Sequence, residues 1–264
     1  MPVVNKQTFI YTVQQGDTLY SIARRFQSSV ETIMKINHIF PPVTDPGLIY
    51  PGNVLLVPTQ NTAKVNYIVQ FGDNINRIAT RFSTFSDLLA GINRITNPNL
   101  IYQGNSLLVP DFIYEIQIND SITTIAQRFG IPLLNIVKVN QGRLGFQSDL
   151  IWAGYHVIIP LPTSRNIVLW SPLPGTQIKS GQRIDGQARA FEANVLHQLR
   201  DYNGVIVSNE RYTTASEGAP AYGYFTSSIP FDRNPTTIAG ELWVYTRSAK
   251  DGSIQDLVRT PVYL

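Results

Sequence analysis

The sequence predicts a multidomain α+β protein in which three βααβ units in tandem are followed by an all-β sandwich. Two observations support this prediction: an internal repeat in the first 160 residues, and a change to evenly spaced strands after residue 166. The repeated segments are YTVQQGDTLYSIARRF (11–26), YIVQFGDNINRIATRF (67–82) and YEIQINDSITTIAQRF (114–129).

Each copy opens with a short strand of alternating character, FIYTVQ, NYIVQ or FIYEIQ, and then turns into a helix. Gly or Asn at the start of the turn suits a positive φ. The Asp, Thr or Ser that follows suits a helix N-cap. The three turns are Gly-Asp-Thr (16–18), Gly-Asp-Asn (72–74) and Asn-Asp-Ser (119–121).

Two helices follow the turn. The first has apolar residues at i, i+3, i+4 and i+7, which predicts one buried face. The second is short and ends at an asparagine that lies 26 residues after the leading tyrosine in every copy: Asn37, Asn93 or Asn140. This constant spacing indicates that the two helices and their turn form one rigid unit.

A loop of variable length closes each copy on LIYPG (48–52), LIYQG (100–104) or LIWAG (150–154), and a final strand ends at a proline. Because two strands alone are marginal in water, the helices must cover one face of the small sheet. The linkers, Thr59 to Asn66 and Asp111 to Ile113, are short. We therefore expect three small domains in a row, at 9–58, 66–110 and 112–160.

Residues 166–264 contain about seven strands and no convincing amphipathic helix, which predicts a β-sandwich. SPLPG (171–175) marks a Pro-Gly turn, and Asn203-Gly204 is the dipeptide preferred in type I′ hairpins. The chain has no cysteine, so a disulfide between the sheets is excluded.

Composition limits the function classes. The formal net charge is only +3, and the longest basic run is Arg24-Arg25, so nucleic acid is not an expected partner. The lack of cysteine also excludes thiolate metal sites and cysteine nucleophiles. We expect no cofactor. The start MPVVNKQTFIY lacks the apolar core of a signal peptide, and no apolar run is long enough to span a membrane.

The motif YTVQ-x-GDT-L-x-x-IA-x-x-F, followed by Asn and then by LIYPG-x-x-L-x-VP, resembles the LysM module over residues 9–160. The resemblance implies a βααβ fold that binds N-acetylglucosamine-containing glycans, namely peptidoglycan or chitin. It also implies a shallow groove between the first turn and the loop before the last strand. A turn of exposed backbone groups beside apolar side chains suits an N-acetyl sugar, which offers an amide and an apolar face.

The resemblance implies one set of groove residues for each copy. In copy one they are Gly16, Asp17, Thr18, Leu19, Leu48, Ile49 and Tyr50. In copy two they are Gly72, Asp73, Asn74, Ile75, Leu100, Ile101 and Tyr102. In copy three they are Asn119, Asp120, Ser121, Ile122, Leu150, Ile151 and Trp152. Copy one matches the family pattern best, and copy three replaces the turn glycine with Asn119 and the loop proline with Ala153, so we expect copy one to dominate binding.

Structural roles remain as alternatives for many of these residues. Asp17 and its two equivalents are expected to cap a helix, which is compatible with ligand contact. The isoleucines of the loops could belong to the core, and their aromatic neighbours could pack beside the turn. Asn37 and its equivalents are expected to be helix C-caps or loop organisers rather than sugar ligands.

The C-terminal segments SPLPG, GQARAFEANV and AKDGS, with the Asn-Gly hairpin, resemble the immunoglobulin-like domain of bacterial sporulation and germination proteins, over 166–264. This resemblance implies a spore-forming bacterium and an adhesive or structural role. Together with the missing signal peptide, it leads us to expect a location in the cell wall or spore envelope, reached by deposition from the mother cell.

An enzyme is the competing class. The histidines His38, His156 and His197 lie in different modules without metal-ligand spacing. A glycosidase needs two carboxylates that frame a cleft, and a sandwich of a hundred residues leaves little room for one. The candidates are Glu192, Asp201, Glu210, Glu217 and Glu241. We therefore expect a non-catalytic glycan-binding protein; the alternative is a morphogenetic spore protein whose sandwich binds a spore or wall protein while the repeats anchor it.

Overall fold

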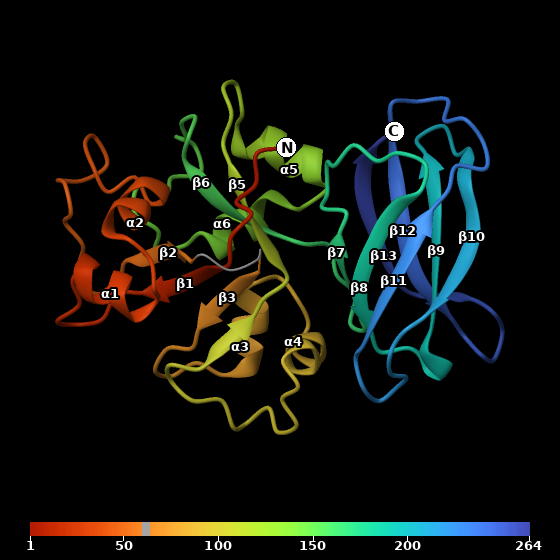
Figure 1. The fold of residues 1–264 in the computed structure, drawn as a ribbon, viewed down its shortest axis with the longest axis horizontal. Helices are drawn as coiled ribbons and strands as arrows, with labels where there is room; N and C mark the ends of the chain where they lie inside the picture. The colour runs from red at the N-terminus through yellow and green to blue at the C-terminus, as the bar shows by residue number, and fades with distance from the viewer. Residues whose placement is uncertain (60–63) are drawn as a thin grey trace.

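The computed structural model describes residues 1–59 and 64–264. Figure 1 shows the three repeats grouped on one side of the molecule and the C-terminal strands beside them. Part of the expected linker from Thr59 to Asn66 lies outside the described residues, and Asn66 itself already belongs to a strand. Among the described residues, no helix is long and apolar enough to cross a membrane.

Repeat 1 has the predicted order of strand, helix, helix, strand. Strand β1 (Thr8–Thr12) pairs antiparallel with β2 (Val54–Pro58), and helices α1 (Leu19–Arg25) and α2 (Val30–Ile36) lie between them in the chain. The apolar face of α1 is buried, as its period predicts.

Repeats 2 and 3 follow the same order. Repeat 2 consists of β3 (Val65–Ile68), α3 (Ile75–Arg81), α4 (Ser86–Ile92) and β4 (Ser106–Leu108). Repeat 3 consists of β5 (Asp111–Glu115), α5 (Ile122–Phe129), α6 (Leu133–Val139) and β6 (His156–Pro160).

Repeats 1 and 2 share one four-stranded sheet of order β2-β1-β3-β4, which the sequence does not predict. The first strands β1 and β3 run parallel, with Ile10 opposite Tyr67. Ile10 packs with the helices of repeat 2, whereas Ile68 of β3 packs with those of repeat 1. The helices of the two repeats therefore cover opposite faces of the sheet (Figure 1).

The first strand of repeat 3 is covered differently. Sheet β5-β6 has two strands, but residues 2–4 lie along the free edge of β5. The amide of Val4 donates to the carbonyl of Ile113, and the amide of Glu115 donates to the carbonyl of Pro2, both at 3.0 Å. In all three repeats the outer edge of the first strand is thus paired, which removes an exposed row of backbone groups.

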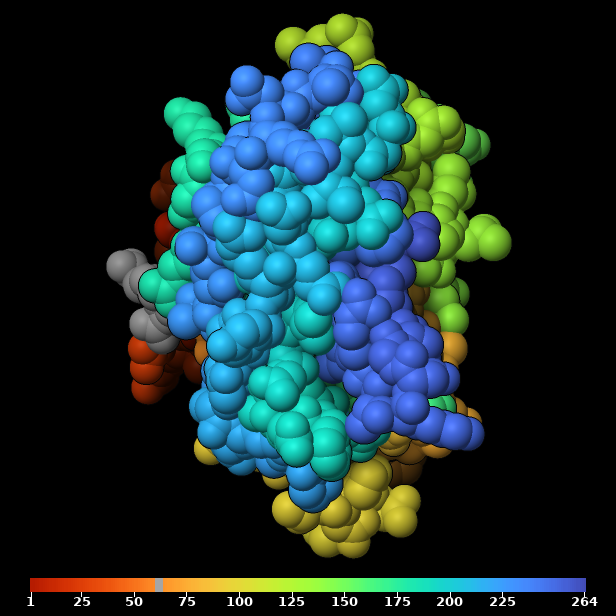
Figure 2. Space-filling model, turned by 90° about the vertical axis from the view of Figure 1, so that its right-hand side faces the viewer, coloured from red at the N-terminus to blue at the C-terminus, as the bar shows by residue number. Residues whose placement is uncertain are grey.

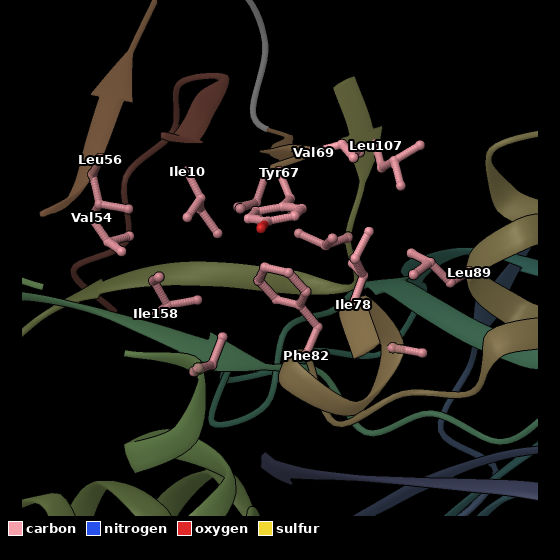
Figure 3. Packing of buried hydrophobic residues seen from close by; sticks show 14 of the residues in the cluster. Ile10, Val54, Leu56, Tyr67, Val69, Ile78, Phe82, Leu89, Leu107 and Ile158 are labelled. Atoms are coloured by element: carbon pink, nitrogen blue, oxygen red, sulfur yellow. The ribbon is translucent and has the colours of Figure 1, made fainter. Parts of the chain in front are cut away.

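The three repeats share a hydrophobic core. Figure 3 shows Ile10 and Leu56 of repeat 1, Tyr67 of repeat 2 and Ile158 of repeat 3 facing one common region. A polar contact also joins repeats 1 and 3, because the buried Arg143 donates to the carbonyl of His156 and lies 3.4 Å from Asn37 Oδ1. The repeats are therefore packed modules and not beads on flexible linkers.

The C-terminal region is a seven-stranded sandwich, as predicted. One sheet has the order β11-β8-β7, and the other has the order β10-β9-β12-β13. A short 3₁₀ helix, η1 (Phe191–Ala193), precedes β9. The strands are β7 (Ile167–Ser171), β8 (Gln182–Ala188), β9 (Asn194–Asp201), β10 (Ile206–Thr214), β11 (Gly223–Ile229), β12 (Ala239–Arg247) and β13 (Ile254–Tyr263).

One local prediction in the sandwich is wrong. A type I′ turn needs a positive φ at both central residues, but of Asn203 and Gly204 only Gly204 has one, at 85°. Asp201 organises this turn, because its Oδ1 accepts the amides of Asn203 and Val205. The carboxylate therefore supplies the turn contacts that the dipeptide alone does not.

The sandwich packs tightly against the repeats. Phe129 of α5 comes so close to Gly175 that a Cβ there would lie 2.9 Å from the ring. Val168 of β7 shares a buried cluster with Leu88 of α4 and Phe129. Figure 2 shows the opposite side of the sandwich, where residues of the C-terminal strands make up most of the visible surface.

Candidate functional site

The turn after each first strand is held by its aspartate. In repeat 1, Asp17 Oδ2 accepts the Tyr11 hydroxyl at 2.6 Å and the Gln14 amide at 2.7 Å. The same two bonds recur at Asp73 and Asp120. The prediction that these aspartates cap the helices is therefore wrong. The N-caps are the next residues, Thr18, Asn74 and Ser121.

The tyrosine in this arrangement is fixed as a neutral hydrogen-bond donor. Burial, followed by the hydrogen bond to Asp17, raises the pKa of Tyr11 to about 12. Burial and Asp120 act in the same way on Tyr114, whose pKa is also raised to about 12. The hydroxyl thus ties the middle of the strand to the turn at neutral pH.

The first residue of each turn has the positive φ that the sequence predicts. The φ values are 85° at Gly16, 80° at Gly72 and 68° at Asn119. Asn is one of the few residues other than Gly that tolerates this region. Repeat 3 therefore keeps the turn although it has lost the glycine.

The loop before each last strand is hydrogen-bonded to the residue that follows the first strand. In repeat 1, the amide of Gly52 donates to the carbonyl of Val13 and the amide of Val13 donates to the carbonyl of Asn53, both at 2.9 Å. Equivalent pairs join Val69 to residues 104–105 and Ile116 to residues 154–155. These bonds hold the loop of each copy beside the residue that follows the first strand, three residues before the turn residue of positive φ.

The loops expose apolar side chains beside these hydrogen bonds. Tyr50 is 57% exposed and Tyr102 is 62% exposed, and Leu48, Leu100 and Leu150 are exposed as well. The isoleucines between them are partly buried and pack against the cores, which favours the structural alternative for Ile49, Ile101 and Ile151. The leading apolar residues of the helices, Leu19, Ile75 and Ile122, are buried.

Trp152 differs from the tyrosines of the other two loops. Trp152 is half-buried, whereas the two tyrosines are exposed. Its ring packs edge-on against the ring of Tyr155, with 5.9 Å between the centroids. Tyr155 stands where repeats 1 and 2 have Asn53 and Asn105, whose Oδ1 atoms accept the amides of Tyr50 and Tyr102. The loop of repeat 3 is therefore built on an aromatic contact in place of an asparagine bond.

The sequence reasoning missed two exposed residues in the turns. Phe71 is 90% exposed and Ile118 is 81% exposed, at the position of Gln15 in repeat 1. The signal that could have identified them is a large apolar residue at a position between a glutamine and the turn residue, where repeat 1 has the polar Gln15. Each adds an exposed apolar surface beside the turn residue of its repeat.

The asparagine after the second helix has the structural role expected of it. The amide of Asn37 donates to the carbonyls of Ile33 and Leu56, and its Oδ1 accepts the amide of Leu56. Asn93 and Asn140 make the same three bonds in their repeats. They fasten the helix end to the last strand.

Repeat 3 has an ion pair at its turn. Arg128 Nη2 lies 2.7 Å from Asp120 Oδ1, and the Asp120 side chain is 3% exposed. Burial alone would raise the pKa of Asp120, but hydrogen bonds from Tyr114, the Gln117 amide and Arg128 outweigh it and lower the pKa. In repeat 1, Arg25 instead reaches the Tyr11 hydroxyl, at 3.4 Å.

Three of the five carboxylates considered for catalysis have structural partners. Glu210 pairs with Arg247, Glu241 accepts the indole N–H of Trp243, and Asp201 organises the hairpin. Among the described residues there is no group of three or more His, Asp or Glu side chains able to hold a metal ion. Glu192 and Glu217 are exposed. The structure brings His38 of repeat 1 near His156 of repeat 3, where burial, followed by the charges of Arg143 and His38, lowers the pKa of His156 to about 4. His197 lies apart from them, in the sandwich.

Comparisons with known proteins agree with the two parts of the structure. The family model "LysM domain" matches residues 11–58, 67–110 and 114–160, which together make up more than half of the chain. The family model "Immunoglobulin-like domain of bacterial spore germination" matches residues 166–253.

Similar proteins include an autolysin of Enterococcus faecalis, 27% identical over 59% of this chain and 25% of its own. The N-acetylmuramoyl-L-alanine amidase sle1 of Staphylococcus epidermidis is 31% identical over 38% of this chain and 33% of its own. The Bacillus cereus spore cortex-lytic enzyme SleL has a solved structure, with a TM-score of 0.30 and 32% identity over 39% of this chain and 22% of its own. This chain spans a third or less of the length of each.

Proposed function

The chain belongs to the LysM family, with an immunoglobulin-like domain of bacterial spore germination after its three repeats, and from this we propose that it is a non-catalytic glycan-binding protein of the cell wall or spore envelope. Its ligands are polymers that contain N-acetylglucosamine. The groove residues of each repeat carry the binding, and no cofactor takes part.

One observation supports this proposal: the same arrangement occurs three times. In each copy an exposed turn residue follows a strand end that is hydrogen-bonded to a loop with exposed apolar side chains. Backbone amides and carbonyls can bond the N-acetyl group, and an exposed ring such as Tyr50 or Phe71 can pack against a pyranose face. A polymer can engage more than one site, which raises avidity by roughly 10²–10⁴ where the geometry permits.

The relatives that carry enzyme names overlap this chain over a limited part of their length. We propose that the overlap reflects the wall-binding part of those proteins. The family models that match this chain describe LysM and immunoglobulin-like domains, which supports a binding role. The match to the immunoglobulin-like domain of bacterial spore germination supports a spore or wall location.

A second candidate function concerns the sandwich. Trp243 lies between two guanidinium groups, with Arg200 Cζ at 4.1 Å and Arg259 Cζ at 4.7 Å from its ring centroid. Trp and Arg held in a fixed arrangement are the residue types that dominate protein interfaces. This cluster favours a protein partner for the sandwich, so the chain would link a glycan to a spore or wall protein.

Co-sedimentation of the full chain with insoluble peptidoglycan and with chitin tests the glycan proposal. We expect retention that soluble N-acetylglucosamine oligomers reverse. Phe71→Ala should weaken retention, and Phe85→Ala is its matched control, because Phe85 is a 43% exposed phenylalanine of the same repeat outside the proposed groove. No retention, or retention that neither the oligomers nor Phe71→Ala reduces, would refute the proposal.

A further inference from the structure

A cleft of about 650 Å³ opens where the three repeats meet. It exists only because the repeats pack together, since each contributes part of its wall. Repeat 1 contributes Thr12, Gly52 and Val54. Repeat 3 contributes Lys138, Gln141 and Gly142. Repeat 2 contributes one face of α3, with Arg77 and Arg81, and Asp73 of its turn.

The wall of this junction cleft is basic. It includes three cationic side chains, Arg77, Arg81 and Lys138, against one carboxylate, Asp73. That carboxylate already accepts the Tyr67 hydroxyl and the Gln70 amide through one oxygen. Arg81 has no ion-pair partner within 4.0 Å in the described part of the chain, but the buried Asp111 carboxyl is close enough to interact with it electrostatically. The excess of positive charge in the cleft therefore comes chiefly from Arg77 and Lys138.

Arg77 connects the cleft to the proposed groove of repeat 2. Its Nη1 donates to the carbonyl of Gly72 at 2.8 Å, in the turn that forms the first wall of the groove. The equivalent residues of repeats 1 and 3 are Ser21 and Thr124, whose hydroxyls close a capping box on the helix. Repeat 2 thus has a cation at a position where the other repeats have a local structural bond.

We propose that the junction cleft binds a carboxylate carried by the glycan that occupies the groove of repeat 2. This inference rests on the proposed function and narrows its ligand class. Peptidoglycan carries free carboxylates on its stem peptides, and on muramic acid where no stem peptide is attached, whereas chitin is uncharged. The chain then prefers an acidic N-acetylglucosamine polymer over a neutral one of equal length, through Arg77 and Lys138.

Calorimetric titration of the full chain with three ligands tests this. They are a peptidoglycan glycan fragment with free carboxylates, the same fragment with its carboxylates amidated, and a neutral chito-oligosaccharide with the same number of sugars. We expect the free acid to bind on the order of threefold to tenfold more tightly than the amide, as one or two partly exposed charge pairs would give. The preference should shrink in 1 M salt.

Variants locate the preference. Arg77→Ser introduces the residue that repeat 1 uses at this position, and Lys138→Gln removes the charge from α6. Each should reduce the ratio of the two affinities. Lys138→Gln should leave binding of the neutral oligosaccharide unchanged, whereas Arg77→Ser also removes a contact to the groove wall and is judged by the ratio alone. Lys35→Gln is the matched control, because Lys35 holds the equivalent position in α2 and does not line the cleft.

Two results would overturn the inference while the proposed function stands. One is equal affinity of the free acid and the amide for the wild-type chain. The other is a preference that survives in both Arg77→Ser and Lys138→Gln. If none of the three ligands binds, the proposed function fails and this inference fails with it.

Discussion

Repeats 1 and 3 form the same turn after their first strand with different residues. Repeat 1 has Gly16 and an aspartate that bonds a tyrosine and a backbone amide, whereas repeat 3 has Asn119 and adds Arg128 to the aspartate. The turn has a positive φ in both. A departure from the sequence pattern at the turn therefore leaves the fold of the turn intact.

The larger difference lies in the loop before the last strand. Tyr50 of repeat 1 is more than half exposed, while Trp152 of repeat 3 packs on Tyr155. His38 of repeat 1 also contacts the carbonyl of Gly154 at 2.8 Å. The comparison teaches that a weaker site in repeat 3 would come from its loop and its neighbours, and not from the missing glycine.

The largest expected effect concerns the aspartates. Asp120→Ala leaves Arg128, the Tyr114 hydroxyl and a backbone amide without their acceptor, so it should lower the free energy of unfolding by about 2–3 kcal/mol. Arg128 is a third exposed, which keeps the loss below that of a fully buried pair. Asp17→Ala should cost about 1–2 kcal/mol. Urea unfolding of both variants measures this, and a larger loss in Asp17→Ala would contradict the account.

The ion pair between Asp120 and Arg128 makes a pH-dependent contribution to the free energy of unfolding. Because the pKa of Asp120 is lowered in the folded state, its stabilisation is present above the unfolded value of about 3.9 and is lost as pH falls through the folded value. The difference in unfolding free energy between wild type and Asp120→Asn should stay constant from pH 7 to about 5 and shrink below about 4. If the difference in unfolding free energy grows on acidification, the pKa of Asp120 is not lowered in the folded state.

The turn substitutions rank the copies as binding sites. Valine at a positive φ costs about 1–3 kcal/mol of strain, so Gly16→Val and Asn119→Val should both distort their turns. We expect Gly16→Val to lose more affinity for a long chito-oligosaccharide, because we predict that copy one dominates. Gly181→Val is the control, since Gly181 has a φ of 84° in the sandwich. A greater loss in Asn119→Val, with both variants folded, would reverse the ranking.

The smallest expected effect is the difference in stability between alanine variants of Tyr50 and Trp152, the aromatic residues of the loops of repeats 1 and 3. Tyr50→Ala should change the free energy of unfolding by less than about 0.5 kcal/mol, because the ring is mostly exposed. Trp152→Ala removes an aromatic contact and should cost about 0.5–1.5 kcal/mol more. Thermal unfolding compares them. Equal costs would mean that the contact between Trp152 and Tyr155 does not stabilise the loop.

The sequence predicts the elements of every repeat because their signals are local. The apolar period of α1, the positive φ at Gly16 and the asparagine at the helix end each depend on a few neighbouring residues. The cap was misplaced by one residue because Asp and Thr are both good caps. Asp17 accepts the Tyr11 hydroxyl in place of capping the helix. This contact crosses the turn, so the local sequence pattern does not contain it.

The arrangement of the repeats could not be predicted in this way. Every first strand has a free edge, and nothing in the repeated motif says that β1 will pair with β3 while β5 pairs with residues 2–4. The junction cleft follows from that arrangement, so it was not foreseen either. The exposure of Phe71 could not be predicted for a related reason. Whether a side chain is buried depends on which residues pack against it in the folded chain.

Retention of the full chain on insoluble peptidoglycan tests the central claim most directly, because the tight contact at Gly175 argues against cutting the chain in two. A variant with Tyr50→Ala and Tyr102→Ala is compared with one that carries Tyr212→Ala and Tyr224→Ala, which removes two exposed tyrosines from the sandwich. We predict at least a tenfold loss of affinity for the first, the size of about 1.4 kcal/mol, and no change for the second. Equal losses, or a loss confined to the sandwich variant, would contradict the claim that the repeats bind the glycan.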